Sequence, residues 1–426
     1  MLDFCHDAPT QKTKNADRDI TISFRTHWVS KFRFYLQKLA LTISTVLLFI
    51  PLFVIAGDPI SLDTIPPPLP DPFFYFGQDY GSESQFGALN VFLNVGFVTT
   101  GRMTQSPRFS DIDFNRNGTI LFNSLFHQRH AINEDYDNGL TGFFTSEFVP
   151  SYLPAIPNYL LHFVGEGMLS RKLEEYYQSR GFQGIWPKVL SISAVVASQQ
   201  VNELVEFGYV LHPKSDPVAD LYFNTAGIVA FSLDSIAKLF SNEWVRLYYW
   251  PGQPVVDIRD SGLFNHGETY LLRTTLGSRT DWKFALLFGL PTNGLGVSIP
   301  LENGDNLTIM PLATDQLIRP RGYETPTREE LLTQLNGDDL DQKVSHDLVI
   351  KEFNYSVNLY WDRSGSLLAS LAICYEPEFN LSLNVYPSVM SVGPVGVGGY
   401  LVASQNGAST VGMTLSVSPV VLGTRF

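Results

Sequence analysis

Polar side chains recur at helical spacing in one stretch of this chain, between residues 155 and 240. His162 and Glu166 are four residues apart, and Asp220 and Asn224 repeat that interval further on. Side chains three or four residues apart share one face of a helix. A histidine among carboxylates suits general acid–base catalysis or the binding of a divalent cation. We therefore predict a catalytic cluster, with no organic cofactor, made of His162, Glu166, Glu203, Glu206, Asp220 and Asn224.

Three helices must position these side chains. Apolar periodicity, leading prolines and a closing glycine predict helices at Asn158–Tyr177, Pro187–Gly208 and Pro217–Phe240. If the three helices pack together, their polar stripes converge on one site. Buried ionisable groups are costly, so such a convergence points to a role. The alternative is structural, because a polar stripe is usually the solvated face of an amphipathic helix.

The order of these polar motifs has a counterpart in known proteins. The motifs are His162-x3-Glu166, Glu203-x2-Glu206 and Asp220-x3-Asn224-x2-Gly227. This skeleton resembles that of VanZ-like proteins, although Glu206 stands where that family usually has Gln, and Pro157-Asn158 replaces its usual Asp-Lys. The chain also resembles uncharacterised bacterial outer-membrane families that carry such a helical module within a β-barrel. The resemblance implies a membrane-associated module and does not imply a reaction.

A different period governs the end of the chain. Apolar residues alternate with small or polar ones at 353–361, 381–385 and 411–417. Period two places one apolar and one polar face on a strand. Repeated over many hairpins, it is typical of strands that face lipid on one side and a lumen on the other. We predict a mainly β fold with an α insert: a transmembrane antiparallel β-barrel of about 12 strands, range 10–14, with three inserted helices.

The two ends of the chain indicate its compartment. The apolar run Leu39–Ala56 follows several basic residues and precedes small residues, as in a secretory signal peptide. An uncleaved amino-terminal anchor is the alternative. The terminal Phe426 resembles the signal by which the barrel-assembly machinery recognises bacterial outer-membrane proteins. We expect the bacterial outer membrane, with its lipid and lipopolysaccharide as partners.

These signals divide the chain into five parts. The first barrel strands are expected at Gly87–Thr100 and Gly118–His127. A charged stretch, Arg319–Lys343, interrupts the later strands as a long loop. The expected parts are a signal peptide with upstream extension at 1–56, a Pro-rich periplasmic linker at 57–82, first barrel strands at 83–150, a helical insert at 151–241, and remaining strands at 242–426 with a loop at 314–346.

Composition excludes some functions. The formal net charge of −13 disfavours nucleic-acid binding through bulk charge.

Two further patterns imitate metal sites. Residues 113–118 begin like a calcium loop, but Ser124 stands where a bidentate Glu is required, so an Asn-Gly turn is the alternative. His127 and His130 are three residues apart, which on a strand sends them to opposite faces.

Three functions remain open. The first is an outer-membrane protein of structural, channel or transport type, with a lumenal or periplasmic helical module. The second is an enzyme that modifies envelope lipid or glycan, with the His/Glu/Asp cluster as its site. The third is an assembly or adhesion partner that uses the loop Arg319–Lys343.

Overall fold

A computed structural model describes residues 71–98, 109, 112–149, 156, 158–206, 214–257, 262–276, 281–290, 292–316, 352–374, 380–392, 395–404, 409–417 and 420–425. All belong to one compact unit, Leu69–Phe426. The expected signal peptide, most of the expected linker, most of the loop at 314–346 and Phe426 lie outside the described residues.

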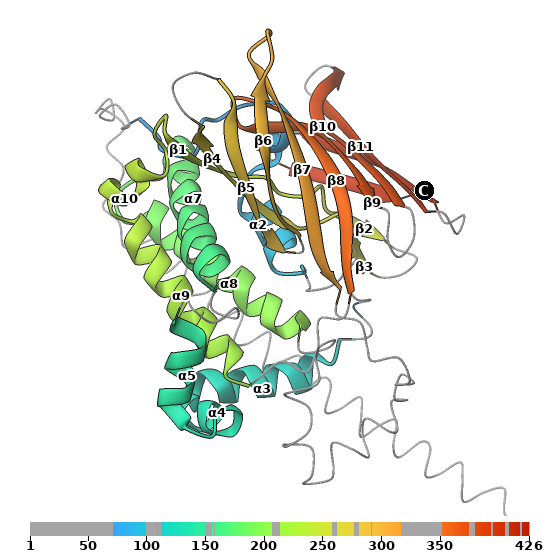
Figure 1. Ribbon diagram of the computed structural model, residues 1–426. Coiled ribbons are helices and arrows are strands. Elements are labelled where there is room, and N and C mark those ends of the chain that lie inside the picture. The colour runs from blue at the N-terminus through green and yellow to red at the C-terminus, as the bar shows by residue number, and fades with distance from the viewer. Residues whose placement is uncertain are drawn as a thin grey trace, which may run out of the picture. The chain divides into compact units, whose positions relative to one another are not determined.

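Antiparallel strands make up most of the second half of this unit (Figure 1). Eleven of the described strands form one sheet, in the order β1-β4-β5-β6-β7-β8-β9-β10-β11-β12-β13, and β2 and β3 form a separate hairpin. The fold is therefore mainly antiparallel β with α-helical content. The strands are β1 (Val245–Tyr249), β2 (Val255–Asp257), β3 (Gly262–Phe264), β4 (Glu268–Thr275), β5 (Lys283–Leu290), β6 (Thr292–Pro300), β7 (Asp305–Gln316), β8 (Glu352–Arg363), β9 (Ser366–Cys374), β10 (Asn380–Val392), β11 (Val395–Ser404), β12 (Ser409–Val417) and β13 (Val420–Arg425).

The two faces of the sheet differ in chemistry. Because directly paired residues of antiparallel strands share a face, the register defines each face. One row is apolar across seven strands: Val297, Ile309, Leu359, Leu371, Leu383, Leu401 and Val411. The neighbouring row on the other face is largely polar: Ser298, Thr308, Tyr360, Ser370, Asn384 and Tyr400. We call these the apolar face and the polar face.

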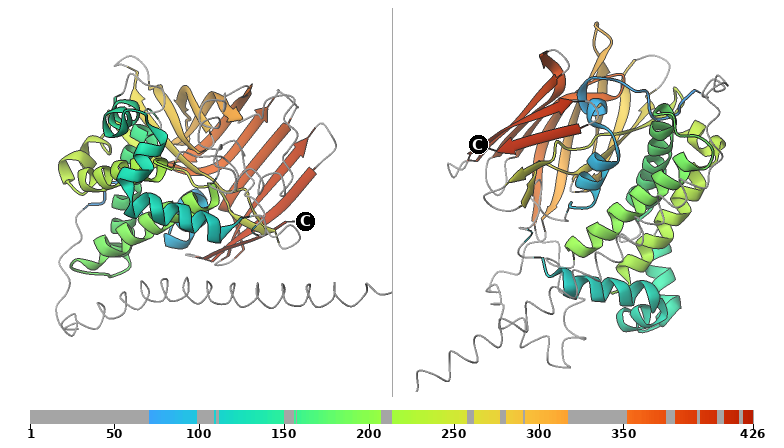
Figure 2. Two further views of the ribbon diagram at one scale, coloured as in Figure 1. Left: turned by 90° about the horizontal axis from the view of Figure 1, so that it is seen from below. Right: turned by 180° about the vertical axis from the view of Figure 1, so that it is seen from behind.

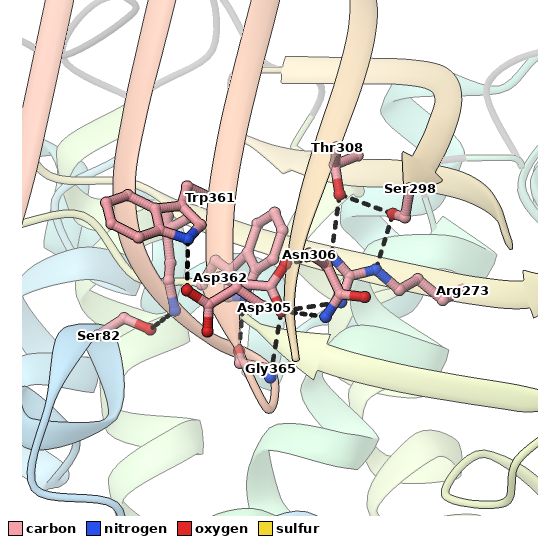
Figure 3. Close-up of polar contacts among 11 residues, drawn as sticks. Ser82, Arg273, Ser298, Asp305, Asn306, Thr308, Trp361, Asp362 and Gly365 are labelled. Carbon is pink, nitrogen blue, oxygen red and sulfur yellow. Dashed lines mark hydrogen bonds and ion pairs between the residues drawn. The ribbon is translucent and has the colours of Figure 1, made fainter. Parts of the chain in front are cut away.

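The sheet curls toward its polar face. Arg273 of β4 donates through Nη1 to Asp362 Oδ2 of β8 at 3.0 Å (Figure 3). Four strand intervals separate β4 from β8, which in a flat sheet is roughly 19 Å. Trp250, which follows β1, packs into the resulting concavity against Leu271, Tyr360 and Leu367. The polar face is thus the inner, filled side of the curl.

The described strands do not close into the barrel that the sequence pattern predicted. The edge strands β1 and β13 do not pair with each other in the described sheet. Instead the chain leaves β1, crosses the concavity and places β2 beside β13. Gln253 marks this crossing, because its amide donates to Val385 O of β10 and its oxygen accepts from Thr414 Oγ1 of β12.

Helices occupy most of the first half of the unit. A helical layer stands beside the β1–β4–β5 end of the sheet (Figures 1 and 2). The helices are η1 (Gly81–Gln85), α2 (Ala88–Val95), α3 (Phe114–Phe126), α4 (Gln128–Asp135), α5 (Gly139–Phe148), η3 (Asn158–Glu166), α7 (Gly167–Ser179), α8 (Trp186–Glu206), α9 (Asp216–Phe231) and α10 (Asp234–Leu239).

The main apolar core lies between these helices and the sheet. Leu173 of α7, Val195 of α8 and Phe231 of α9 belong to the same buried cluster as Tyr249 of β1 and Tyr270 of β4. The helices therefore cover the apolar face at β1, β4 and β5. In the described residues, no helix is both long and apolar enough to span a membrane.

The helices expected between 158 and 240 are confirmed, except that Pro217–Phe240 forms two helices, α9 and α10, and not one. The strands expected between 83 and 150 are wrong. The segment Gly87–Thr100 contains α2, and Gly118–His127 lies largely in α3. In α2 the buried residues are Asn90, Val91, Asn94 and Val95, a helical interval. A short apolar alternation cannot by itself separate strand from helix. Here the Asn94 side chain decides, since it accepts from Gly267 N and so ties α2 to the loop before β4.

Candidate functional site

The first helix of the site begins with an unusual turn. Residues Asn158–Glu166 form a π-helix that continues directly into α7. Extra-wide turns of this kind are often found at functional sites. Both His162 and Glu166 lie in this π-helix and both are buried. The π-helix therefore positions two of the six predicted residues.

The imidazole of His162 faces helix α9. Its Nδ1 lies 3.2 Å from Asn224 Oδ1, and its Nε2 lies 3.3 Å from Asp220 Oδ1. Burial lowers the pKa of His162, which favours a neutral ring, against the opposing effect of nearby carboxylates such as Glu268. When Nδ1 donates to Asn224, the Nε2–Oδ1 contact needs one proton between its two atoms, because neither a bare nitrogen nor a carboxylate can donate. In the tautomer protonated at Nδ1, the contact between His162 and Asp220 therefore holds a shared proton.

Helix α8 contributes the two remaining carboxyls. The Glu203 carboxyl meets that of Asp220, and burial, followed by the charges of Asp220 and Asp216, raises its pKa well above the ordinary value. Glu206 lies close enough for its charge to act on both His162 and Glu203. The structure thus brings together all three polar stripes.

A strand completes the cluster. Glu166 is fully buried, and burial, then the charge of Glu268, raises its pKa well above 4.5. Tyr270 of β4 donates its hydroxyl hydrogen to Glu268 Oε2 at 3.0 Å or to Glu166 Oε1 at 3.4 Å. Two carboxyls this close cannot both ionise without water or a cation. The Glu166–Glu268 pair is therefore held by a proton.

Sequence reasoning missed Glu268 and Tyr270. The signal was present in β4, where Glu268, Tyr270 and Leu272 alternate on the face that the helices cover. A glutamate at the start of an otherwise apolar strand face has to find a buried partner. Gln199 of α8, four residues before Glu203, adjoins Glu166 and was also outside the predicted set.

Close glycine contacts hold the helices at this distance. A Cβ on Gly165 would lie 2.7 Å from the Tyr270 ring. A Cβ on Gly227 would lie 2.2 Å from Phe163 O of η3. Gly227 is needed because the backbones of α9 and η3 approach too closely for a side chain, and Gly165 is needed because the Tyr270 ring packs directly on it. The Asp-x3-Asn-x2-Gly motif therefore supplies two polar groups and the contact surface that presents them to His162.

Side-chain exposure decreases across the site, from the His162 end to Glu166. The side chains of His162 and Asp220 are 10% and 14% exposed, whereas Glu166 has no exposed surface. The His162 end is thus the more exposed part of the cluster. Carboxyls whose pKa is raised toward neutrality are the groups that general acid catalysis uses. Within the described part of the chain, no group of three or more His, Cys, Asp or Glu side chains is arranged to hold a metal ion.

The two sequence patterns that imitate metal sites, at residues 113–118 and at His127 and His130, form other structures. Asp113 is the N-cap of α3, and its Oδ1 accepts from Arg116 N at 3.0 Å. The expected turn at Asn117-Gly118 is absent because both residues lie inside that helix. The exposed His130 pairs with Glu134 at 3.1 Å, four residues along α4, and not with His127.

A second polar cluster lies on the other face of the sheet (Figure 3). The Arg273 guanidinium donates to Ser298 Oγ and Thr308 Oγ1 at 2.8 Å, and to both oxygens of Asp362. Gly365 N also donates to Asp362 Oδ2 at 3.2 Å. All five nitrogen-bound hydrogens of arginine form a planar fork, and most find a partner here. We regard this cluster as structural, since it joins β4, β6, β7 and β8.

The chain was compared with protein-family models, with curated proteins and with solved structures, and none of the three comparisons gives a match. The resemblance to VanZ-like proteins therefore stays a prediction.

Proposed function

We propose that this protein is a bacterial outer-membrane protein of structural or anchoring type, whose sheet contacts lipid and holds a helical module at the membrane. One observation supports the proposal most. Beyond the helical layer, the apolar face is exposed and the polar face is buried: Leu295 is 55% and Val357 50% exposed, whereas Ser298 and Thr308 have no exposed surface. Water does not favour this inversion, but a bilayer does.

The extent of the face strengthens this proposal. Isolated exposed apolar residues are common on any protein, but a contiguous patch indicates an interaction surface. Here exposed side chains come from five strands of one sheet: Leu295, Ile309, Val357, Ile373 and Val411. Exposed tryptophans, Trp244 and Trp282, stand where β1 begins and just before β5.

Paired substitutions test the proposal. On the apolar face, Val357→Lys places a charge in lipid, for which we expect a cost of about 2–4 kcal/mol and loss of protein from the outer-membrane fraction. The matched control is Val229→Lys on α9, because Val229 is 60% exposed outside the sheet. We expect that control to stay within about 0.5 kcal/mol of the parent. Equally mild effects of both substitutions would refute the membrane face.

The inner side of the curl argues against an open pore. Trp250 Nε1 donates to Gly365 O at 2.8 Å, and Tyr386 OH donates to Pro251 O at 2.8 Å. These bonds hold the segment between β1 and β2 in place across the concavity. We therefore favour the structural type over the channel type.

A second function, an envelope lipid- or glycan-modifying enzyme, is favoured by the His162–Asp220–Asn224 arrangement. A histidine oriented on both nitrogens, at the exposed end of proton-sharing carboxyls, suits acid–base work. Two single variants, His162→Ala and Asp220→Asn, test this function. Loss of an envelope phenotype with unfolding free energy and membrane yield unchanged supports catalysis. If both variants fail to accumulate folded, the cluster is structural and the enzyme hypothesis fails.

A further inference from the structure

A pocket outside the carboxyl cluster has no part in the functions proposed above. Its volume is 290 Å³, and it lies between residues 75–86 and the end of α7. That volume is at the lower end of small-molecule sites, which begin at roughly 300 Å³. Polar side chains predominate in its lining, among them Gln78, Asp79, Glu83, Ser179 and Arg180.

The lining is fixed from two sides. On the helical side, Glu175 of α7 accepts from the backbone N–H groups of Phe74 and Tyr75 at 2.8 and 2.9 Å. On the sheet side, Ser82 Oγ accepts from Leu367 N at 3.0 Å, and Ser366 Oγ donates to Tyr80 O at 2.7 Å (Figure 3 shows Ser82). A lining held by both layers is preorganised, which lowers the entropy cost of binding.

The lining is rich in hydrogen-bond acceptors. Ser84 Oγ donates to Gly81 O and Ser179 Oγ donates to Tyr176 O, both at 2.7 Å. Because both hydroxyl hydrogens are used within the protein, these oxygens can act only as acceptors toward a guest. Within the described residues, Glu83 Oε2 and Gln78 Oε1 are buried acceptors with no hydrogen-bond partner. These two atoms are enclosed, so the acceptors open to a guest are the exposed Asp79 carboxylate and Ser179 hydroxyl oxygen of the lining.

The charges of the pocket balance. The Glu83 carboxylate is ion-paired with the buried Lys172 ammonium. The carboxylate of Asp79 and the guanidinium of Arg180, which lies 5.1 Å from the Tyr176 ring centre, are the remaining charges. An anion would meet the carboxylates, and a cation would meet Arg180. The balance favours a neutral guest.

We propose that this pocket binds a neutral sugar residue. Sugar hydroxyls donate to the Asp79 carboxylate and accept from Arg180, and Tyr75 and Phe86 contribute the small apolar part of the lining. The proposal does not depend on the membrane contact of the sheet, because the pocket lies on residues 75–86 and α7.

Saturation-transfer NMR tests the proposal on the full chain in a sugar-free zwitterionic detergent. The probes are methyl glucoside and the methyl glycoside of N-acetylglucosamine, with tetramethylammonium and inorganic phosphate as charged competitors. Asp79→Ala and Arg180→Ala remove exposed groups of the lining, and Arg129→Ala removes a matched exposed arginine on α4. We expect transfer to sugar ring protons, at least fivefold weaker in both lining variants and unchanged in Arg129→Ala.

Three results would overturn it. The first is no transfer to either sugar in the parent protein. The second is equal transfer in the parent and in both lining variants, which would indicate adventitious contact elsewhere. The third is displacement of the sugar by phosphate or tetramethylammonium at equal concentration, which would assign the pocket to a charged ligand. Circular dichroism of each variant confirms that the fold is kept.

Discussion

At the scale of single residues, this protein buries carboxyl groups against one another. The strongest electrostatic influences on the pKa of Glu166 and of Glu203 are other carboxyls, Glu268 and Asp220 respectively. Ionisation of both members of such a pair would leave adjacent negative charges away from water. Protons therefore hold η3, α8 and α9 together, which couples the stability of the helical module to pH.

Replacement of Glu166 by glutamine should make the protein more stable at neutral pH. The unfolded chain releases the Glu166 proton near 4.5, whereas the folded protein holds it to higher pH. The unfolded state therefore binds fewer protons in that window, so the free energy of unfolding falls as pH rises from about 4.5 through the raised folded pKa. Glu166→Gln removes this loss. We expect a gain of about 1–3 kcal/mol at pH 8 and little change at pH 4.

Denaturant unfolding across this pH range measures the effect. Glu174→Gln, a partly buried glutamate on α7, is the control. It should leave the pH dependence as in the parent. A Glu166→Gln variant less stable than the parent at pH 8 would mean that the carboxyl is ionised and paired, contrary to the proton-sharing arrangement.

The Arg273–Asp362 ion pair should matter far more than a similar pair at the surface. Both side chains are buried, at 2% and 0% exposure. Arg273→Met leaves Asp362 charged and enclosed, for which we expect a loss of about 3–5 kcal/mol. The comparison is Arg363→Met, because Arg363 is 49% exposed and its enclosed partner Asp305 keeps two other donors, Trp361 Nε1 and Asn303 Nδ2. Unfolding free energies that rank the two variants in the opposite order would contradict the buried clamp.

At the scale of elements, the pattern of the later strands could be predicted and that of the early segments could not. In β8, β10 and β12 the apolar face continues across neighbouring strands, so the period-two signal coincides with a real face. In α2 and α3 the apolar residues are too few to distinguish the two periods. Tertiary bonds decide there, such as the donation of Asn117 Nδ2 to Leu204 O at 2.7 Å.

The candidate site, too, could be predicted only in part. Spacing along each helix predicted the three polar stripes, because neighbours at three or four residues are fixed by helix geometry. The strand partner Glu268 lies far along the chain from Glu166, and no local rule joins them. The curl of the sheet, which depends on Arg273 reaching Asp362, is likewise invisible until the strands are paired.

Helix α9 should tolerate no side chain at its closest approach to η3. At Gly227 a Cβ would meet Phe163 O at 2.2 Å. Gly227→Ala must therefore push α9 away, and overpacking of this kind costs about 1–3 kcal/mol. Gly118→Ala on α3 is the control, because its nearest neighbour would be Leu204 at 3.7 Å. There alanine should stabilise the helix by up to about 1 kcal/mol.

Thermal unfolding separates the two glycine variants. The Gly227→Ala variant should also disturb the His162 ring, which NMR chemical shifts of its Nδ1 and Nε2 report, since Asn224 and Asp220 move with α9. A Gly227→Ala protein as stable as Gly118→Ala, with unchanged ring shifts, would show that the contact between α9 and η3 is loose.

At the scale of the whole molecule, different parts of the sheet have different surroundings. The helices cover its apolar face at β1, β4 and β5, and the same face is exposed from β6 onward. The inner face carries the Arg273 cluster and the crossing segment from β1 to β2. In the function proposed above, lipid contacts the exposed part of the apolar face, and protein fills the inner side.

This packing predicts that the protein conducts no ions. A channel needs a continuous water-filled path, whereas Trp250, Tyr360 and Tyr386 form one buried cluster in the concavity and Gln253 bonds across it to β10 and β12. We expect purified full-length protein in planar bilayers to show no stepwise conductance, while a porin in the same bilayers does. Incorporation has to be shown independently, by recovery of the protein with floated vesicles. Discrete conductance steps that vanish on Gln253→Trp, a substitution that enlarges the crossing segment, would contradict the filled interior and favour the channel type.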